Sequence, residues 1–114
     1  MLYLMLIYQD DTKMKAASLE EQAAIGKGYG ELNTFLAQSG TLRGTATWPA
    51  GITTVRSREG KTLTTDGPYA ETREGVGGFF LVDVEDLDAA IKIAERVPGT
   101  RYGGVEIRPV KAAE

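Results

Sequence analysis

The stretch Thr65-Asp66-Gly67-Pro68-Tyr69-Ala70-Glu71-Thr72 lies between two strand-rich halves of the chain and predicts a sharp corner. An Asp side chain can accept a hydrogen bond from a backbone N–H two residues on, Gly tolerates unusual dihedral angles, and Pro locks φ. Pro68 also disfavours helical geometry at the residue before it. The chain is therefore expected to bend here and to hold the carboxylates of Asp66 and Glu71 and the phenol of Tyr69 near one corner.

The composition predicts one domain, residues 1–114, and excludes several classes of site. The chain carries 13 basic and 16 acidic residues, a net charge of −3, so it lacks the basic surface that nucleic acid requires. It has no Cys and no His. The absence of both excludes disulfides, thiolate nucleophiles, His dyads and the commonest transition-metal ligands. No cofactor motif is present, and no acidic pair has the spacing of a metal-coordinating loop.

The longest apolar run, residues 1–8, indicates a buried strand in a cytoplasmic protein. A membrane-spanning helix needs about 20 apolar residues. A signal peptide has a basic start and a cleavage site of small residues, and this run has neither. We therefore expect no membrane association.

Periodicity and turn residues predict a chain of strands and helices in a definite order. A capping box, Ser18 with Glu21, begins the first helix, and Gly40 fits its C-terminal cap. Asp86 is the expected N-cap of the second helix. The glycines at 26, 28 and 30 are costly inside a helix and favour close packing against another element or a frayed turn. The expected strands are 2–8, 42–48, 79–84 and 104–110, the expected helices are 18–38 and 86–97, and an inserted hairpin spans 52–57 and 61–66.

This order is typical of an α+β, ferredoxin-like fold, β-α-β-(β-hairpin)-β-α-β, with two helices on one face of an antiparallel sheet. The strands 2–8 and 79–84 are apolar on both faces and are expected to be central neighbours. The face opposite the helices then combines apolar residues of these strands with Glu106 and Arg108 of the last strand. Such a mixed face is poor as open surface and suits a cleft shared by two subunits of a homodimer.

Several segments resemble the DGPF-type proteins of the YCII-related family. The segment Thr65–Glu74, followed by Gly77-Gly78-Phe79-Phe80-Leu81, is similar to the signature of that branch. The segment Pro98–Pro109 and the opening strand Leu4–Tyr8 are also similar. The likeness covers nearly the whole chain, and its spacing is specific.

The resemblance implies a dimeric α+β barrel, in which two ferredoxin-like subunits join sheet to sheet, without a settled activity. Some relatives occur beside or fused to alternative sigma factors. In the wider group a His-Asp pair has been proposed as an active site, and some relatives look like dehydrochlorinases or lactone-handling enzymes. This chain has no His, so such a pair cannot be carried over. Where the family usually has Phe, this chain has Tyr69.

Asp66 is the first candidate for acid–base chemistry or for anchoring a ligand at the rim of the cleft. Its structural alternative is to cap its own turn, which would lower the pKa of the carboxyl group and make it a poorer base. Glu106 is the second catalytic candidate, and Arg108 is the candidate anchor for an anionic ligand. An interfacial salt bridge is the alternative for these two.

The remaining candidate ligand-binding residues are Tyr69, Glu71, Arg73 and Tyr102. Glu71 and Arg73 lie on a long connection, and such loops often carry function. A solvated ion pair is the alternative for them. Two functions remain open. One is a cofactor-free enzyme of lyase or isomerase type acting on a small organic acid or aromatic compound. The other is a non-enzymatic ligand-binding or accessory module linked to transcriptional regulation, with a regulatory protein partner.

Overall fold

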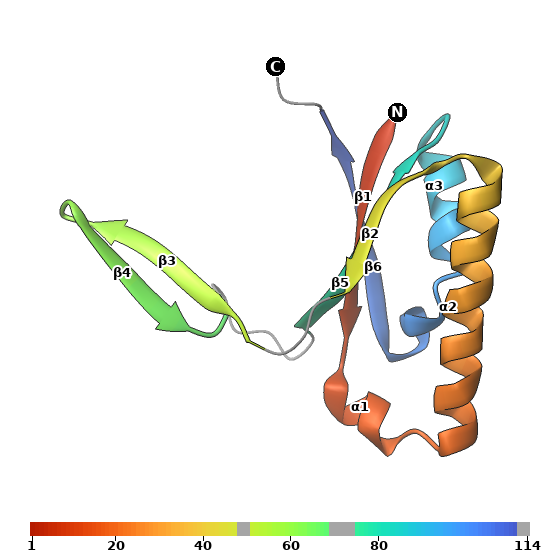
Figure 1. The fold of residues 1–114 in the computed structure, drawn as a ribbon, viewed down its shortest axis with the longest axis horizontal. Coiled ribbons are helices and arrows are strands. Elements are labelled where there is room, and N and C mark those ends of the chain that lie inside the picture. Colours follow the sequence, from red (N-terminus) through yellow and green to blue (C-terminus); the bar gives the residue numbers. More distant parts are fainter. Residues whose placement is uncertain (48–50, 69–74, 112–114) are drawn as a thin grey trace.

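The computed structural model describes residues 1–47, 51–68 and 75–111, and they form two sheets and four helices. Figure 1 shows their arrangement. No helix among the described residues is both long and apolar enough to cross a membrane. In chain order the elements are β1 (Leu2–Gln9), α1 (Asp11–Ala16), α2 (Leu19–Ser39), β2 (Leu42–Thr47), β3 (Thr53–Arg58), β4 (Lys61–Asp66), β5 (Gly75–Asp83), α3 (Leu87–Ala94), the 3₁₀ helix η1 (Pro98–Tyr102) and β6 (Gly103–Val110).

The main sheet has four antiparallel strands in the order β2-β5-β1-β6. The predicted pairing of the two most apolar strands is confirmed, since β1 lies beside β5 with Met5 opposite Phe80. On its other side β1 pairs with β6, where Met5 lies opposite Ile107. The helices α2 and α3 cover one face of this sheet, as Figure 1 shows. The predicted α+β, ferredoxin-like arrangement is therefore confirmed.

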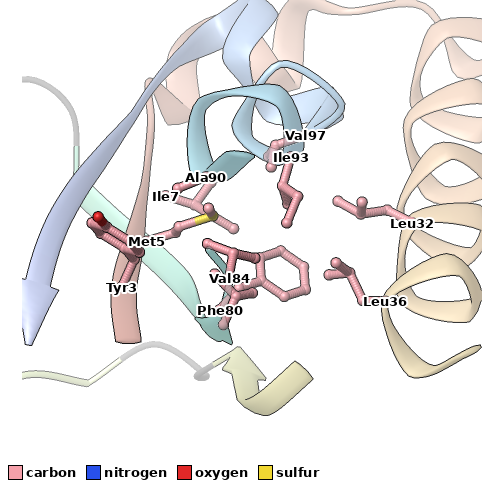
Figure 2. Packing of buried hydrophobic residues seen from close by; sticks show 11 residues of the cluster. Tyr3, Met5, Ile7, Leu32, Leu36, Phe80, Val84, Ala90, Ile93 and Val97 are labelled. Atoms are coloured by element: carbon pink, nitrogen blue, oxygen red, sulfur yellow. The ribbon is translucent and has the colours of Figure 1, made fainter. Parts of the chain in front are cut away.

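The hydrophobic core fills the space between the sheet and the two covering helices (Figure 2). Alternate residues of β1 point into it, while the intervening leucines point to the other face. Full burial of a side chain such as Leu36 stabilises the fold by about 1.5–3 kcal/mol. The buried members of this cluster are Tyr3, Met5, Ile7, Leu32, Leu36, Phe80, Val82, Val84, Ala90, Ile93 and Val97.

The helix ends follow from side chains that satisfy free backbone groups, as the sequence predicts. Ser18 Oγ accepts a hydrogen bond from the N–H of Glu21 at 3.0 Å. Asp86 Oδ1 accepts one from the N–H of Ala89 at 2.9 Å. Gly40 ends α2 in the left-handed conformation, with φ of 71°. These contacts replace the bonds that the first and last turns of a helix lack.

Three local features differ from the sequence-based expectation. The helix α1 was not expected; the buried carboxylate of Asp10 caps it by accepting from the N–H groups of Thr12 and Lys13. Most of the segment between the second predicted helix and the last predicted strand forms the 3₁₀ helix η1. The second predicted helix ends at Ala94 rather than at residue 97, because the N–H groups of Arg96 and Val97 bond to carbonyl oxygens three residues back, those of Ile93 and Ala94, instead of four.

The strands β3 and β4 form a hairpin that we call the arm, residues 53–66. Its turn has positive φ at Glu59 (52°) and Gly60 (78°), the geometry that matches strand twist in a two-residue connection. The hairpin predicted for this segment is confirmed. Figure 1 shows that the arm projects from the body on the side of the main sheet opposite α2 and α3. We call that uncovered side of the sheet the open face.

The predicted corner begins where the arm returns to the body. Gly67 has φ of 115°, and its N–H donates to the carbonyl oxygen of Ile52 at 2.8 Å. The residue two positions after Asp66 is Pro68, which has no N–H, so the expected bond to the Asp66 carboxylate cannot form there. Backbone pairing across the base of the arm holds this part of the turn instead.

Candidate functional site

The strand register places the predicted mixed set of side chains on the open face. Leu6 lies opposite Phe79 on one side and Glu106 on the other. Leu4 lies opposite Leu81 and Arg108 in the same way. Because paired residues of antiparallel strands share a face, these apolar and charged groups form one surface.

Glu106 and Arg108 bind each other on this open face. Arg108 Nε donates a hydrogen bond to Glu106 Oε1. The Arg108 side chain is 63% exposed and the Glu106 side chain is 40% exposed. The hydrogen bond and charge of Glu106 raise the pKa of Arg108. Arg108 is therefore a permanent cation whose first partner is an internal carboxylate, and an anionic ligand would compete with Glu106 for it.

Tyr102 lies apart from this pair. Its hydroxyl donates to Glu21 Oε2 at 2.7 Å and so joins η1 to the first turn of α2 on the helical side. The hydrogen bond to the Glu21 carboxylate raises the pKa of the Tyr102 phenol. The structure thus does not bring Tyr102 together with Glu106 and Arg108.

Asp66, the first catalytic candidate, ends β4 at the base of the arm and is exposed. It lies opposite Thr53 in the hairpin register. The candidates Tyr69, Glu71 and Arg73 lie outside the described residues. Their ligand-binding roles, like the catalytic roles of Asp66 and Glu106, stay predictions.

A cavity of about 220 Å³ lies between α2 and the ends of β1, β2 and β5. The strands supply Gln9, Thr45 and Thr47, and the helix supplies Tyr29 and Asn33. Apolar walls surround these polar groups, an arrangement typical of small-molecule sites. The apolar and glycine members of the lining are Ile7, Ala46, Gly77, Gly78, Phe79 and Phe80.

Tyr29 is the best-positioned polar group of this cavity. Gln9 Nε2 donates to the phenol oxygen at 3.5 Å. Partial burial raises the pKa of Tyr29, while the bonds from Gln9 and the Gly99 backbone oppose that rise. The phenol therefore keeps its proton at neutral pH and can donate it in a hydrogen bond to a ligand oxygen.

Two glycines make room for this arrangement. A Cβ atom at Gly99 would lie 2.5 Å from the Tyr29 hydroxyl and 3.2 Å from Gln9 Nε2. A Cβ atom at Gly78 would lie 2.8 Å from the carbonyl oxygen of Ala46 in the neighbouring strand. A side chain at either position would displace a wall of the cavity.

The described lining can bind and orient a ligand, but it contains no ionisable acid or base other than the phenol. Among the residues that the structure describes, no three Asp or Glu side chains gather as metal ligands. A second hollow, on the outer surface of α2 between Lys27 and Gln38, is open and bounded by that helix alone. The cavity beneath α2 is thus the better candidate site.

Sequence reasoning missed this cavity because its polar groups come from separate elements. Tyr29 fits the apolar stripe of the long helix, and Gln9 follows a buried strand, so neither stands out alone. The available signal is the pair Gly77-Gly78 in an apolar strand, since Gly within a strand often marks close approach of a ligand or another backbone.

Comparison with known proteins identifies the family and the fold. The model of the YCII-related domain matches residues 1–114. An uncharacterized protein of Rhizobium meliloti (strain 1021) is 33% identical over 114 residues, covering 96% of this chain and 92% of the relative.

A solved structure is also similar to this chain: the 5-chloro-2-hydroxyhydroquinone dehydrochlorinase TftG from Burkholderia phenoliruptrix AC1100, in complex with 2,5-dihydroxybenzoquinone. The TM-score is 0.52 at 14% identity, covering 99% of this chain and 96% of the other. At that identity the likeness concerns the fold.

Proposed function

The chain belongs to the YCII-related family, and from that premise we propose that it binds a small oxygenated ring compound in the cavity beneath α2. The single observation that carries this proposal is the Tyr29 phenol, held by Gln9 and Gly99 at the wall of a mostly apolar cavity. A protonated phenol recognises carbonyl, hydroxyl or carboxylate oxygens.

The size of the cavity supports a ligand with one ring. A cavity of about 150 Å³ suffices for benzene, and this one measures about 220 Å³. The difference leaves room for a few oxygen substituents. The ligand in the TftG complex, 2,5-dihydroxybenzoquinone, belongs to this class and is a suitable first probe.

A cofactor-free lyase or isomerase activity is the second candidate function. The similarity of fold to a dehydrochlorinase favours it. Such an activity would use a site outside the cavity, because Asp66, Glu106 and Arg108 are absent from the cavity lining. There Asp66 or Glu106 would supply the acid or base and Arg108 would anchor an anion. The further candidate ligand contacts are Tyr69, Glu71, Arg73 and Tyr102.

We propose that the protein acts as a single-domain homodimer in the cytoplasm. The partly apolar open face, with leucines opposite Phe79 and Leu81, supports association of two sheets. A face that contacts its own copy forms a closed pair about a twofold axis. A regulatory protein partner is the alternative use of this surface.

Calorimetric titration with 2,5-dihydroxybenzoquinone tests the proposal. We expect saturable binding to the wild type, and about tenfold weaker binding to Tyr29→Phe because one hydrogen bond to the ligand is lost. Tyr3→Phe is the matched control, since the Tyr3 hydroxyl bonds to Met1 Sδ and not to any cavity residue. No binding to the wild type, or equal binding to Tyr29→Phe, would refute the assignment.

A further inference from the structure

The arm combines exposed apolar surface with a lack of support from the body. Val55 is 62% exposed and Leu63 is 48% exposed. Its two strands pair only with each other among the described residues. An isolated two-stranded hairpin is marginally stable in water, so the arm lacks the third strand or helix that such a ribbon needs.

The direction of the arm identifies where that support lies. Figure 1 shows the arm leaving the body on the side of the open face, away from α2 and α3. A subunit docked on the open face would lie in the angle between the sheet and the arm. Two packed sheets are about 10 Å apart, and strands of six residues extend about 20 Å. The arm is long enough to pass the partner's sheet and reach its helical layer.

The two faces of the arm differ in charge. One face of the arm carries Thr53, Val55 and Ser57 of β3 together with Thr62, Thr64 and Asp66 of β4. This face carries a single charge, at the base of the arm. The opposite face carries Arg56, Arg58 and Lys61 around Leu63. Burial of three cationic side chains costs more free energy than burial of Thr, Ser and Val side chains, so the first face, which we call the neutral face, is the one suited to an interface.

Charge also favours a second copy of this chain as the occupant. The arm has three basic and two acidic residues, a net charge of +1, whereas the whole chain has −3. The remainder therefore carries −4, so the net charge of the arm favours its approach to the body of another copy, while its cations lie on the face opposite to Val55. The twofold symmetry of a homodimer would bring each arm to the other subunit.

We propose that the arm clasps the partner subunit and buries its neutral face, centred on Val55, against it. This inference rests on the proposed homodimer and specifies its interface. It also places Asp66, at the base of the neutral face, beside the partner subunit. In that arrangement the Asp66 side chain of each subunit lies at the edge of the interface with the other subunit.

The test compares two Asp substitutions on opposite faces of the same hairpin. Sedimentation of the full chain gives the dimer dissociation constant for the wild type, Val55→Asp and the matched control Leu63→Asp. We expect Val55→Asp to raise the constant about tenfold or more, as for a central interface contact. Leu63→Asp is expected to change it less than about threefold, as for an exposed site outside the interface.

Hydrogen exchange of the wild type at two protein concentrations provides an independent measurement. The arm amides are expected to be protected in the dimer and to lose protection on dilution to monomer. A stable dimer with unprotected arm amides and equal constants for both variants would overturn the clasp and leave the dimer intact. A wild type that is monomeric at every concentration would overturn the clasp and the proposed dimer together.

Discussion

Pro98 packs directly against the backbone of Gly28 in the middle of α2. A Cβ atom at residue 28 would lie 2.7 Å from Pro98 Cγ, closer than real Cβ atoms approach. The neighbouring glycines at 26 and 30 have no such neighbour within 4 Å. Close packing, one of the two explanations for this glycine cluster, is therefore confirmed for Gly28 alone.

Alanine substitutions separate these three glycines. Gly28→Ala is expected to destabilise the protein by about 1–3 kcal/mol, because η1 must move to accept the methyl group. Gly26→Ala and Gly30→Ala are the matched controls and are expected to stabilise it by up to about 1 kcal/mol through helix propensity. Urea unfolding measures all three, and an equal gain at all three positions would refute the contact with Pro98.

The glycines of β5 and β6 provide a similar comparison for the cavity. Gly78→Ala is expected to weaken binding of 2,5-dihydroxybenzoquinone, because the new methyl group pushes β2 from β5 and narrows the cavity. Gly104→Ala on β6 is the control, since a Cβ atom there meets nothing within 4 Å. Calorimetric titration of both variants provides the measurement. Unchanged affinity in Gly78→Ala would show that the ligand binds elsewhere.

The predictable part of the fold is the part determined by local chemistry. Ser18, Asp86 and Gly40 were identified as helix caps because a cap needs only neighbouring backbone groups. The pairing of β1 with β5 follows from their shared two-sided apolar pattern. The helix α1 was not predicted, although Asp10 caps the six residues that follow it.

The candidate site was less predictable because distant elements build it. The register does place Glu106 and Arg108 on the apolar open face, as expected. Tyr102 lies elsewhere, because the 3₁₀ helix η1 places its hydroxyl against Glu21 of α2. The hydrophobic periodicity of the sequence does not predict that 3₁₀ helix. The grouping of Gln9 with Tyr29 depends on the packing of α2 across the sheet.

Asp83 is expected to make stability depend on acid pH. The N-terminal ammonium donates to Asp83 Oδ1 at 3.0 Å and Arg43 lies 3.4 Å from Oδ2. The ammonium, and then Arg43, lower the pKa of Asp83. The carboxylate therefore stabilises the fold above its unfolded-state pKa of about 4. That contribution is lost as the pH falls through the lower, folded-state pKa.

The Asp83→Asn variant tests this sign. It is expected to be less stable than the wild type at neutral pH. The two proteins are expected to be equally stable once the pH is well below the usual pKa range of carboxyl groups. Glu85→Gln, at an exposed carboxylate nearby, is the control. Thermal unfolding across the pH range measures the difference, and a constant difference at all pH values would contradict the linkage.

The bond between Tyr102 and Glu21 distinguishes a structural from a ligand-binding role for Tyr102. Tyr102→Phe and Glu21→Gln are each expected to lower stability, and the double variant is expected to lose less than their sum because both remove one interaction. Binding of 2,5-dihydroxybenzoquinone should stay unchanged in Tyr102→Phe. Lost binding with unchanged stability would instead support the ligand-contact role predicted from sequence.

The most direct test of the central claim is to map binding residue by residue with ¹H–¹⁵N nuclear magnetic resonance during titration with 2,5-dihydroxybenzoquinone. The account predicts saturable shifts at the amides of Gln9, Tyr29, Gly77 and Gly78 around the cavity. Shifts confined to Leu4, Glu106 and Arg108 would place the ligand on the open face and contradict the assignment to the cavity beneath α2.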